Sequence, residues 1–416
     1  MWDPYAELQK FQLSNGLTIY LGTWDRPWLK TGIIVHSGAR HDPNYRQGLA
    51  HFLEHLVSEN LPQLTYEAAK QQFQRFGGTV GFGSTSYDDT TYNFAVPLEG
   101  NNLEFALNLL GHMLIDCEIN QYIERERLVI VREYTKRFPM SWMAERILKR
   151  RQLLFPGTNL AKYIGPLGSP ESIHAISRRD IQEFYDRYYT PANMTIVAVG
   201  GLRPDEFASM LEKSPFGLEK PGVRSQLAIR IGQFNPPIEN RLVHNVSDYS
   251  LQMADQSFIE SFAAIPGYVS TKVLSRVSNV LSDILYNEIR EKRGWTYGFS
   301  TLRENFSEAY EFCIQGAFPW EGLEIIEDLV NECLAEAIRD DDRIRHHIQS
   351  SVMSYKMADI NGSELIEGAM NDLRLFHVVK PLTAELNESA AVTVDDVKAV
   401  LMMLTRERRW TVIAHP

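Results

Sequence analysis

Alternating apolar and polar residues near the N-terminus predict two strands joined by a tight turn. The segment QLSNGLTIYLG places an Asn-Gly pair between two such runs, which is typical of a β-hairpin. Further along, TGIIVHSG (31–38) predicts a buried strand, and TVGFGSTSYDD and TTYNFAVPL predict two more. The first half of the chain is therefore expected to contain a β-sheet.

Apolar residues at helical spacing predict four helices around these strands. The segments are GLAHFLEHLVSEN, YEAAKQQFQRFGG, NLEFALNLLGHMLI and INQYIERERLVIVREYTKRF. The second helix is expected to stop at Gly77 and Gly78, because glycine readily adopts the conformation that ends a helix. Mixed strands and helices of this kind indicate an α+β fold.

Two segments separated by 216 positions resemble each other. RDIQEFYDRYYTPANMTIVAVG (179–200) and DDVKAVLMMLTRERRWTVIAHP (395–416) each place a helix after an Asp and then a closing strand. This predicts a duplicated unit, and hence an α+β chain of two similar halves, each a mainly antiparallel sheet flanked by helices. We expect a first domain over 1–215, a linker rich in Pro and Gly over 216–240, and a second domain over 241–416.

Composition narrows the class of protein. The chain has 416 residues, 44% apolar and 23% charged, which is ordinary for a globular protein. No apolar run approaches the ~18 residues that span a bilayer, and the first residues lack the apolar core of a secretory signal. A net charge of -11 disfavours nucleic-acid binding. Three distant cysteines suggest no disulfide framework, so we expect a cytoplasmic protein. From the apolar runs and the net charge, we expect no membrane partner and no nucleic-acid partner.

The helix over GLAHFLEHLVSEN carries candidate chemistry. His51 and His55 are four residues apart and therefore share one face, with Glu54 beside it. The order His-x-x-Glu-His is the inverzincin signature, in which two imidazoles hold zinc and the carboxylate takes a proton from a metal-polarised water. The alternative is two hydrogen-bonded histidines on a helix with a surface glutamate.

A catalytic zinc needs a third protein ligand. Glu59 lies about 12 Å along the helix axis from His51, which is too far. Glu126 and Glu133 are seven residues apart on one face of another predicted helix, and the apolar run 128–131 suggests that this helix is packed inside. Either glutamate is a candidate; the alternative is that both are ordinary surface residues.

Taken together, these motifs resemble the pitrilysin/insulinase-type inverzincins, in particular their short two-domain branch of processing-peptidase-like proteins. LSNGLTIYL, GIIVHSGARHD, GLAHFLEHL, ERERLVIVREY and PANMTIVAVGG occur in the family's order, and LSDILYNEIREKRGWTYGFST resembles its segment with an Arg and a Tyr seven apart. The resemblance implies zinc ligands at His51, His55 and Glu133. It also implies a general base at Glu54, a supporting catalytic carboxylate at Glu126, and substrate contacts from Arg290 and Tyr297.

The substrate-binding region departs from the family pattern. The strand after the Gly-Gly turn has Gly81-Phe82 where the family often has Asn-Ala, and the segment GFGSTSYDDTTY (81–92) is one residue longer than usual. We expect a peptide to add as a strand along 79–86, touching Gly81, Phe82, Gly83 and Ser84. Arg290 has an alternative structural role, as a partner of Glu288 or Glu291, and Tyr297 could be a half-buried strand residue.

The resemblance implies a Zn2+-dependent endopeptidase that cleaves short or unfolded peptides inside a closed chamber of two half-shells. One chain of this length is one half-shell, so the resemblance also implies a homodimer, or a heterodimer with a related subunit. The second half has GYVSTKVLSRV in place of a His-x-x-Glu-His motif, which leaves metal to the first half alone. The alternative function is a catalytically silent structural or partner subunit of a processing-peptidase-like complex.

Overall fold

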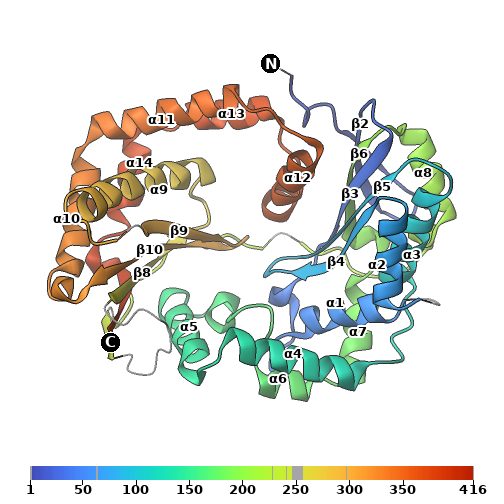
Figure 1. The fold of residues 1–416 in the computed structure, drawn as a ribbon, viewed down its shortest axis with the longest axis horizontal. Coiled ribbons are helices and arrows are strands. Elements are labelled where there is room, and N and C mark those ends of the chain that lie inside the picture. Colours follow the sequence, from blue (N-terminus) through green and yellow to red (C-terminus); the bar gives the residue numbers. More distant parts are fainter. Residues whose placement is uncertain are drawn as a thin grey trace. The chain divides into compact units, whose positions relative to one another are not determined.

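The chain forms two compact units, each assembled from segments that are distant in sequence (Figure 1). The computed structural model describes residues 2–61, 64–226, 228–239, 241–245, 256–296 and 298–415. Unit 1 comprises Met1–Ile147, Tyr163–Leu227 and Asp359–Leu382, and unit 2 comprises Leu148–Lys162, Ala228–Ala358 and Thr383–Pro416. Within the described ranges, no helix has both the length and the hydropathy needed to cross a membrane.

Unit 1 is built on a six-stranded sheet with the order β1-β2-β6-β3-β5-β4. Its strands are β1 (Gln9–Gln12), β2 (Thr18–Thr23), β3 (Trp28–Val35), β4 (Thr79–Thr85), β5 (Thr90–Pro97) and β6 (Met194–Gly200). Only β2 and β6 pair in parallel; the other neighbours are antiparallel. The strands expected from alternation therefore form, and β4 lies at an edge.

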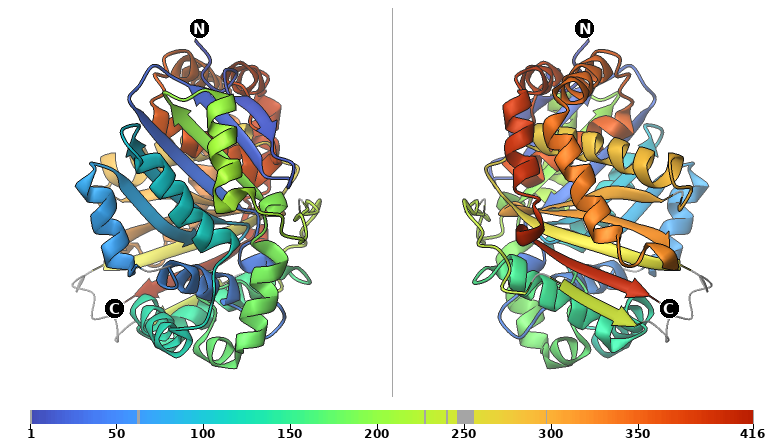
Figure 2. Two further views of the ribbon diagram at one scale, coloured as in Figure 1. Left: turned by 90° about the vertical axis from the view of Figure 1, so that its right-hand side faces the viewer. Right: turned by 90° about the vertical axis from the view of Figure 1, so that its left-hand side faces the viewer.

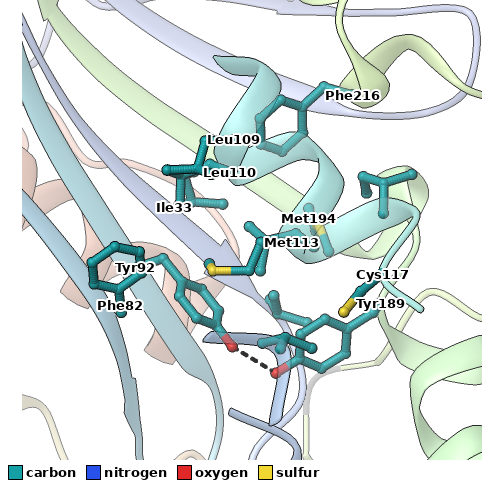
Figure 3. Close-up of a cluster of buried hydrophobic side chains, with 14 of the residues drawn as sticks. Ile33, Phe82, Tyr92, Leu109, Leu110, Met113, Cys117, Tyr189, Met194 and Phe216 are labelled. Carbon is teal, nitrogen blue, oxygen red and sulfur yellow. Dashed lines mark hydrogen bonds between the residues drawn. The ribbon is translucent and has the colours of Figure 1, made fainter. Parts of the chain in front are cut away.

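One face of this sheet is covered by helices from the first half of the sequence. They are α1 (Leu49–Glu59), α2 (Tyr66–Arg75), α3 (Asn102–Ile115), α4 (Ile123–Arg137), α6 (Pro170–Ala175), α7 (Arg178–Tyr188) and α8 (Pro204–Lys213). Figure 3 shows part of this core, where Ile33 and Tyr92 of the sheet meet Met113 of α3. The hydroxyls of Tyr92 and Tyr189 are 2.9 Å apart, so this buried polar pair is satisfied.

The opposite face of the same sheet is covered by α12 (Gly362–Phe376), which comes from the second half of the sequence. Leu365, Ile366, Ala369 and Leu373 of α12 pack on an apolar stripe formed by Tyr20, Ile34, Val197 and Val199. Gly32 permits this close approach, because a Cβ there would lie 2.8 Å from Cγ2 of Ile366. A glycine in the middle of a buried strand thus has a packing reason.

Unit 2 contains a five-stranded sheet with the order β7-β11-β8-β10-β9. Its strands are β7 (Arg241–Asn245), β8 (Gln256–Pro266), β9 (Phe299–Asn305), β10 (Ala309–Pro319) and β11 (Arg409–His415). In the right-hand view of Figure 2, red β11 lies between yellow-green β7 and yellow β8. This order matches β2-β6-β3-β5-β4 of unit 1, including a single parallel pair, so the expected fold of two similar α+β halves is confirmed.

The helices of unit 2 follow the same plan. α9 (Thr271–Leu285), α10 (Ile326–Arg339), α11 (Asp341–Lys356) and α14 (Val394–Met402) contribute to the core on one face, and α13 (Leu382–Ala390) follows α12 in sequence. On the other face lies the C-terminal part of α5 (Ser141–Leu154): Arg150 stacks over Phe262 at 3.9 Å, and Arg151 pairs with Glu304 and Glu311. α5 is therefore the topological counterpart of α12.

The matched segments noted in the sequence occupy equivalent places. Residues 179–200 form most of α7 followed by β6, and 395–416 contain most of α14 followed by β11. Both helices begin with the same capping box, Ser177 with Asp180 and Thr393 with Asp396, which satisfies free backbone N–H groups at the helix start. The local signal and the sheet order thus agree on a duplication.

The compact units differ from the expected boundaries 1–215, 216–240 and 241–416. Residues 148–162 fall in unit 2 and 359–382 in unit 1, because each sheet has a second face that a helix from the other half of the sequence covers. The start of the expected linker is also packed in unit 1: Phe216 is buried, and its carbonyl accepts a hydrogen bond of 2.7 Å from Asn15.

Arg374 of α12 should be important for the stability of unit 1. Its Nε donates to Asp89 at 2.6 Å, and Asp89 is only 1% exposed, at the turn between β4 and β5. Arg374→Ala leaves this carboxylate with the Ser86 hydroxyl alone and should cost about 2–3 kcal/mol of unfolding free energy. Calorimetric unfolding checks this. Arg179→Ala, which removes an exposed pair with Glu183, is the matched control and should leave the melting temperature unchanged.

Candidate metal centre

Helix α1 is held rigidly at its start and along one side. Asp42 accepts hydrogen bonds from the backbone N–H groups of Gly48 (2.7 Å) and Ala50 (2.9 Å), which satisfies donors at the N-terminus of α1. Gly48 has a φ of 94°, a left-handed conformation that suits glycine at this entry. Phe52, Leu53 and the other apolar residues of α1 are buried in the core. The polar face of the helix is thereby fixed in direction.

His51, His55 and Glu133 come together on this face. Oε2 of Glu133 lies 3.9 Å from Nε2 of His51 and 3.8 Å from Nε2 of His55. One ligand atom from each of the three residues lies within 4.8 Å of the others, and no second such group of three occurs in the described part of the chain. The structure thus brings together the three ligands that the family resemblance implies.

These three side chains fit a zinc ion. Two imidazole nitrogens and a carboxylate are a typical catalytic zinc donor set. The separations from Glu133 to the two nitrogens are about twice a zinc–ligand bond of roughly 2.0–2.1 Å, so one ion can lie between all three. Burial lowers the pKa of His51 to about 3, which keeps its imidazole in the neutral form that binds metal.

Glu126 lies behind His55 rather than beside the three ligand atoms. Nδ1 of His55 donates to Oε2 of Glu126 at 3.0 Å, which leaves Nε2 of the ring available for a metal. Burial would lower the pKa of His55, but the bond to Glu126 and the nearby Glu54 carboxylate raise it above the ordinary value. For Glu126, burial alone would raise the pKa. The hydrogen bonds from His55 and Arg125 outweigh this effect and lower the pKa of Glu126 below its usual value.

Glu54 is buried beside the histidines and points toward β4. Its Oε2 accepts a 2.6 Å hydrogen bond from the Thr85 hydroxyl. Burial raises the pKa of Glu54 above the usual value, although the Thr85 bond opposes this shift. Gly83 has a φ of 144° and packs against this carboxylate, since a Cβ there would lie 2.6 Å from Oε1. The strand and the candidate base therefore position each other.

Strand β4 contains one extra residue relative to its neighbour β5. Gly81 pairs with Asn93 and Ser84 with Thr91, which leaves a bulge at Phe82 and Gly83. The bulge lies within the segment 81–92, which the sequence indicates to be one residue longer than is usual in the family. The side chain of Phe82 is buried against Tyr66, with ring centroids 4.5 Å apart, and its carbonyl accepts a hydrogen bond of 2.7 Å from the Ser58 hydroxyl of α1.

An open pocket of about 450 Å3 adjoins the candidate metal ligands. Ten residues line it: Glu54, His55, Ser58, Glu59, Tyr66, Phe82, Gly83, Arg125, Glu126 and Val129. Sequence reasoning assigned no role to Thr85, Tyr66 or Arg125. Thr85 nevertheless lies within the expected peptide strand 79–86, and Arg125 lies within the quoted segment ERERLVIVREY. The expectation that 128–131 is buried is wrong for Leu128 and Val129, which are 53% and 37% exposed, because α4 turns this side outward.

The other expected substrate residues lie in unit 2. Arg290 belongs to the π-helical turn η5 (Tyr286–Glu291) and is half-buried, while Tyr297 lies outside the described residues. Glu288, one of the two alternative partners expected for Arg290, forms an ion pair with Arg293 at 2.8 Å. At the unit 2 counterpart of the α1–β4 contact, the hydroxyls of Ser282 and Thr301 are 2.9 Å apart. Among the residues described there, no set of metal ligands assembles.

Comparisons with known proteins identify a family of peptidases. The model of the insulinase family of peptidases (M16) matches residues 27–153, and that of the M16 inactive domain matches 175–343. An uncharacterized zinc protease of Rickettsia felis is 23% identical over 354 residues, 81% of each chain. A probable mitochondrial-processing peptidase subunit beta of Arabidopsis thaliana is 29% identical over 185 residues, 44% of this chain and 33% of that protein.

Solved structures share the fold over the whole chain. The crystal structure of a peptidase M16 inactive domain from Pseudomonas fluorescens has a TM-score of 0.81 and covers 98% of both chains, at 18% identity. A protease from Helicobacter pylori has a TM-score of 0.75 and 18% identity, and covers 98% of this chain and 99% of that one. At such identities the likeness shows the fold alone.

The ligand assignment predicts a graded loss of zinc. His55→Ala or Glu133→Gln removes one of three ligands and should abolish stoichiometric binding. Glu126→Gln removes only the acceptor behind His55 and should weaken affinity on the order of 10- to 100-fold. Elemental analysis after dialysis, and competition with a chelator, measure both.

Glu54→Gln is the control, because Glu54 is not a ligand in this assignment and its variant should retain zinc. Loss of zinc from Glu54→Gln would place this carboxylate among the ligands. A greater loss at Glu126 than at Glu133 would reverse the roles of the two glutamates.

Proposed function

The chain belongs to the insulinase family of peptidases, M16, and from this premise we propose that it is a zinc-dependent endopeptidase. One observation carries the proposal: two imidazoles and a carboxylate converge beside a buried glutamate that is not part of the ligand set. A metal-dependent hydrolase needs this combination of ligands and proton acceptor. Relatives named zinc proteases support the choice of metal.

His51, His55 and Glu133 would hold the zinc, which supplies a Lewis acid that polarises water. Glu54 would accept the proton of the attacking water and deliver it to the amine of the leaving peptide. Its raised pKa suits this double role, since a carboxylate that holds a proton more tightly is a better acceptor. The Thr85 hydroxyl and the backbone of Gly83 would keep the carboxylate turned toward the reaction.

A peptide would bind as an added strand along the exposed edge of β4. Among the described strands, β4 has a sheet neighbour on one side only, so its other edge can pair with an extended chain. The Phe82 carbonyl is an exception, because it already accepts a hydrogen bond from Ser58. Strand addition favours short or unfolded peptides, which present an extended backbone. The buried, free cysteines Cys117, Cys313 and Cys333 fit a reducing compartment, and we place the activity in the cytoplasm.

The second candidate function is a catalytically silent partner subunit. The match of residues 175–343 to an inactive M16 domain favours it, because this range covers much of the second half. His51, Glu54, His55 and Glu133 all lie in residues 27–153, the range that matches the peptidase model. Their presence in this range favours catalysis. Activity measurements distinguish the two.

Peptide cleavage should depend on zinc and on Glu54. The purified protein should cleave a mixture of unstructured peptides, lose this activity in a chelator, and regain it with added Zn2+. Glu54→Gln should reduce the rate by at least 100-fold while zinc remains bound, because it removes the proton acceptor. Mass spectrometry of the products reports cleavage. A zinc-loaded wild-type protein that cleaves no peptide in any assembly would instead establish the silent subunit.

We further propose that two half-shells assemble, as a homodimer or a heterodimer with a related subunit, and that Arg290 and Tyr297 serve the facing zinc site. An Arg can grip a peptide carbonyl or carboxylate, and a Tyr hydroxyl can donate to a carbonyl near the scissile bond. Two residues of unit 2, in whose described part no set of metal ligands assembles, would thereby take part in catalysis. The proposal makes each active site a joint product of two chains.

Mixing two inactive variants tests this assembly. Glu54→Gln and the double variant Arg290→Ala, Tyr297→Phe should each be inactive alone, and subunit exchange should restore at most half of wild-type activity per mixed dimer. One site in each mixed dimer then has an intact base and an intact Arg and Tyr.

The matched control mixes Glu54→Gln with His51→Ala, which share no complete site and should restore nothing. If exchange is demonstrated by differently tagged subunits and the first mixture stays inactive, the pair does not act across the dimer.

A further inference from the structure

Arg125, in the first turn of α4, joins two carboxylates near the metal ligands. Its Nη2 lies 2.5 Å from Oε2 of Glu59, and its Nε lies 2.8 Å from Oε1 of Glu126. The guanidinium also stacks over the ring of Tyr122, at 4.2 Å from the centroid. A planar group held by two ion pairs and an aromatic face has little freedom to turn.

Glu126 is consequently fixed through both of its oxygens. Oε2 accepts from His55, and Oε1 accepts from Arg125. Without Arg125, the carboxylate could rotate about its terminal torsion and lose its alignment with Nδ1 of His55. The chain of contacts Glu59–Arg125–Glu126–His55 therefore ends at a metal ligand. It also ties the C-terminal end of α1 to the start of α4.

We propose that Arg125 is a positioning residue of the metal centre, which holds Glu126 so that His55 presents Nε2 to the zinc. This inference rests on the proposed function, since it assumes zinc at His51, His55 and Glu133. The competing role for Arg125 is contact with substrate, because its side chain is 49% exposed and lines the pocket. Two carboxylates already engage its donors, which favours the positioning role.

The experiment measures zinc affinity of Arg125→Gln by chelator competition, without any peptide. We expect affinity to fall by a factor of about 5–10, at or below the lower end of the 10- to 100-fold typical when a direct partner of a ligand is removed. Arg125→Lys keeps the charge but not the two-pronged contact, and should recover only part of the affinity. Substitution of Co2+ for zinc should show an altered visible spectrum in Arg125→Gln, as expected for a reoriented His55.

Two further variants separate positioning from charge. Arg132→Gln removes an exposed arginine from the same helix and should leave the zinc affinity unchanged. Glu59→Gln frees one end of Arg125 and should weaken zinc about two- to threefold, with no added effect in the Arg125→Gln background, because both act through one contact chain. Glu59→Gln also provides the test if Arg125→Gln fails to fold.

The zinc affinities of wild type, Arg125→Gln and Arg132→Gln distinguish failure of the proposed function from failure of the positioning role. If wild-type protein binds no zinc, the proposed function fails. If wild type binds zinc and Arg125→Gln binds it within twofold, the positioning role is wrong, and a raised KM at unchanged zinc affinity would assign Arg125 to the substrate instead. An equal loss in Arg132→Gln and Arg125→Gln would attribute the effect to charge alone and also overturn the proposal.

Discussion

The crossing of α1 and α4 is the constraint on which the candidate centre depends. His51 and His55 lie on α1, and Glu126 and Glu133 lie on α4, so a small rotation of either helix would separate the ligand atoms. Asp42 fixes the start of α1, and Arg127 fixes α4 by donating to the carbonyl of Ile176 at 3.0 Å. A site built on two packed helices is more precisely placed than one on loops.

The edge strand β4 couples this helix pair to the place where a peptide would bind. The Ser58 hydroxyl of α1 donates to the carbonyl of Phe82, and Thr85 donates to Glu54. The bulge in β4 accommodates its extra residue and sets Gly83 against the carboxylate. A change in the strand therefore affects the base directly, which gives the bulge a physical role in the site.

The two units show how one topology supports different chemistry. The five strands of unit 2 follow the order of β2-β6-β3-β5-β4 in unit 1, and both units have a similarly capped helix before the closing strand. The contact between the helix that follows the third strand of this order and the edge strand differs between the units. In unit 1 it involves Glu54 and Thr85, and in unit 2 the hydroxyls of Ser278 and Ser282 each form a hydrogen bond with the hydroxyl of Thr301. Fold is thus preserved while the donors differ, as expected when function resides in side chains on a common scaffold.

The sequence by itself determined the main elements of the first half and the two histidines of the centre. Alternation gave the strands, helical spacing placed His51 and His55 on one face, and the 216-residue offset indicated two similar halves, because these signals are local or repeated. The choice between Glu126 and Glu133 rested on family resemblance, and only the crossing of α4 over α1 distinguishes their positions. Tertiary structure also decided the features that depend on packing between distant segments. The C-terminal part of α5 belongs to unit 2, and α12 belongs to unit 1. Leu128 and Val129 are exposed, and Thr85 and Arg125 contact Glu54 and Glu126. No local pattern records which distant surface a helix will cover, so these features required the folded chain.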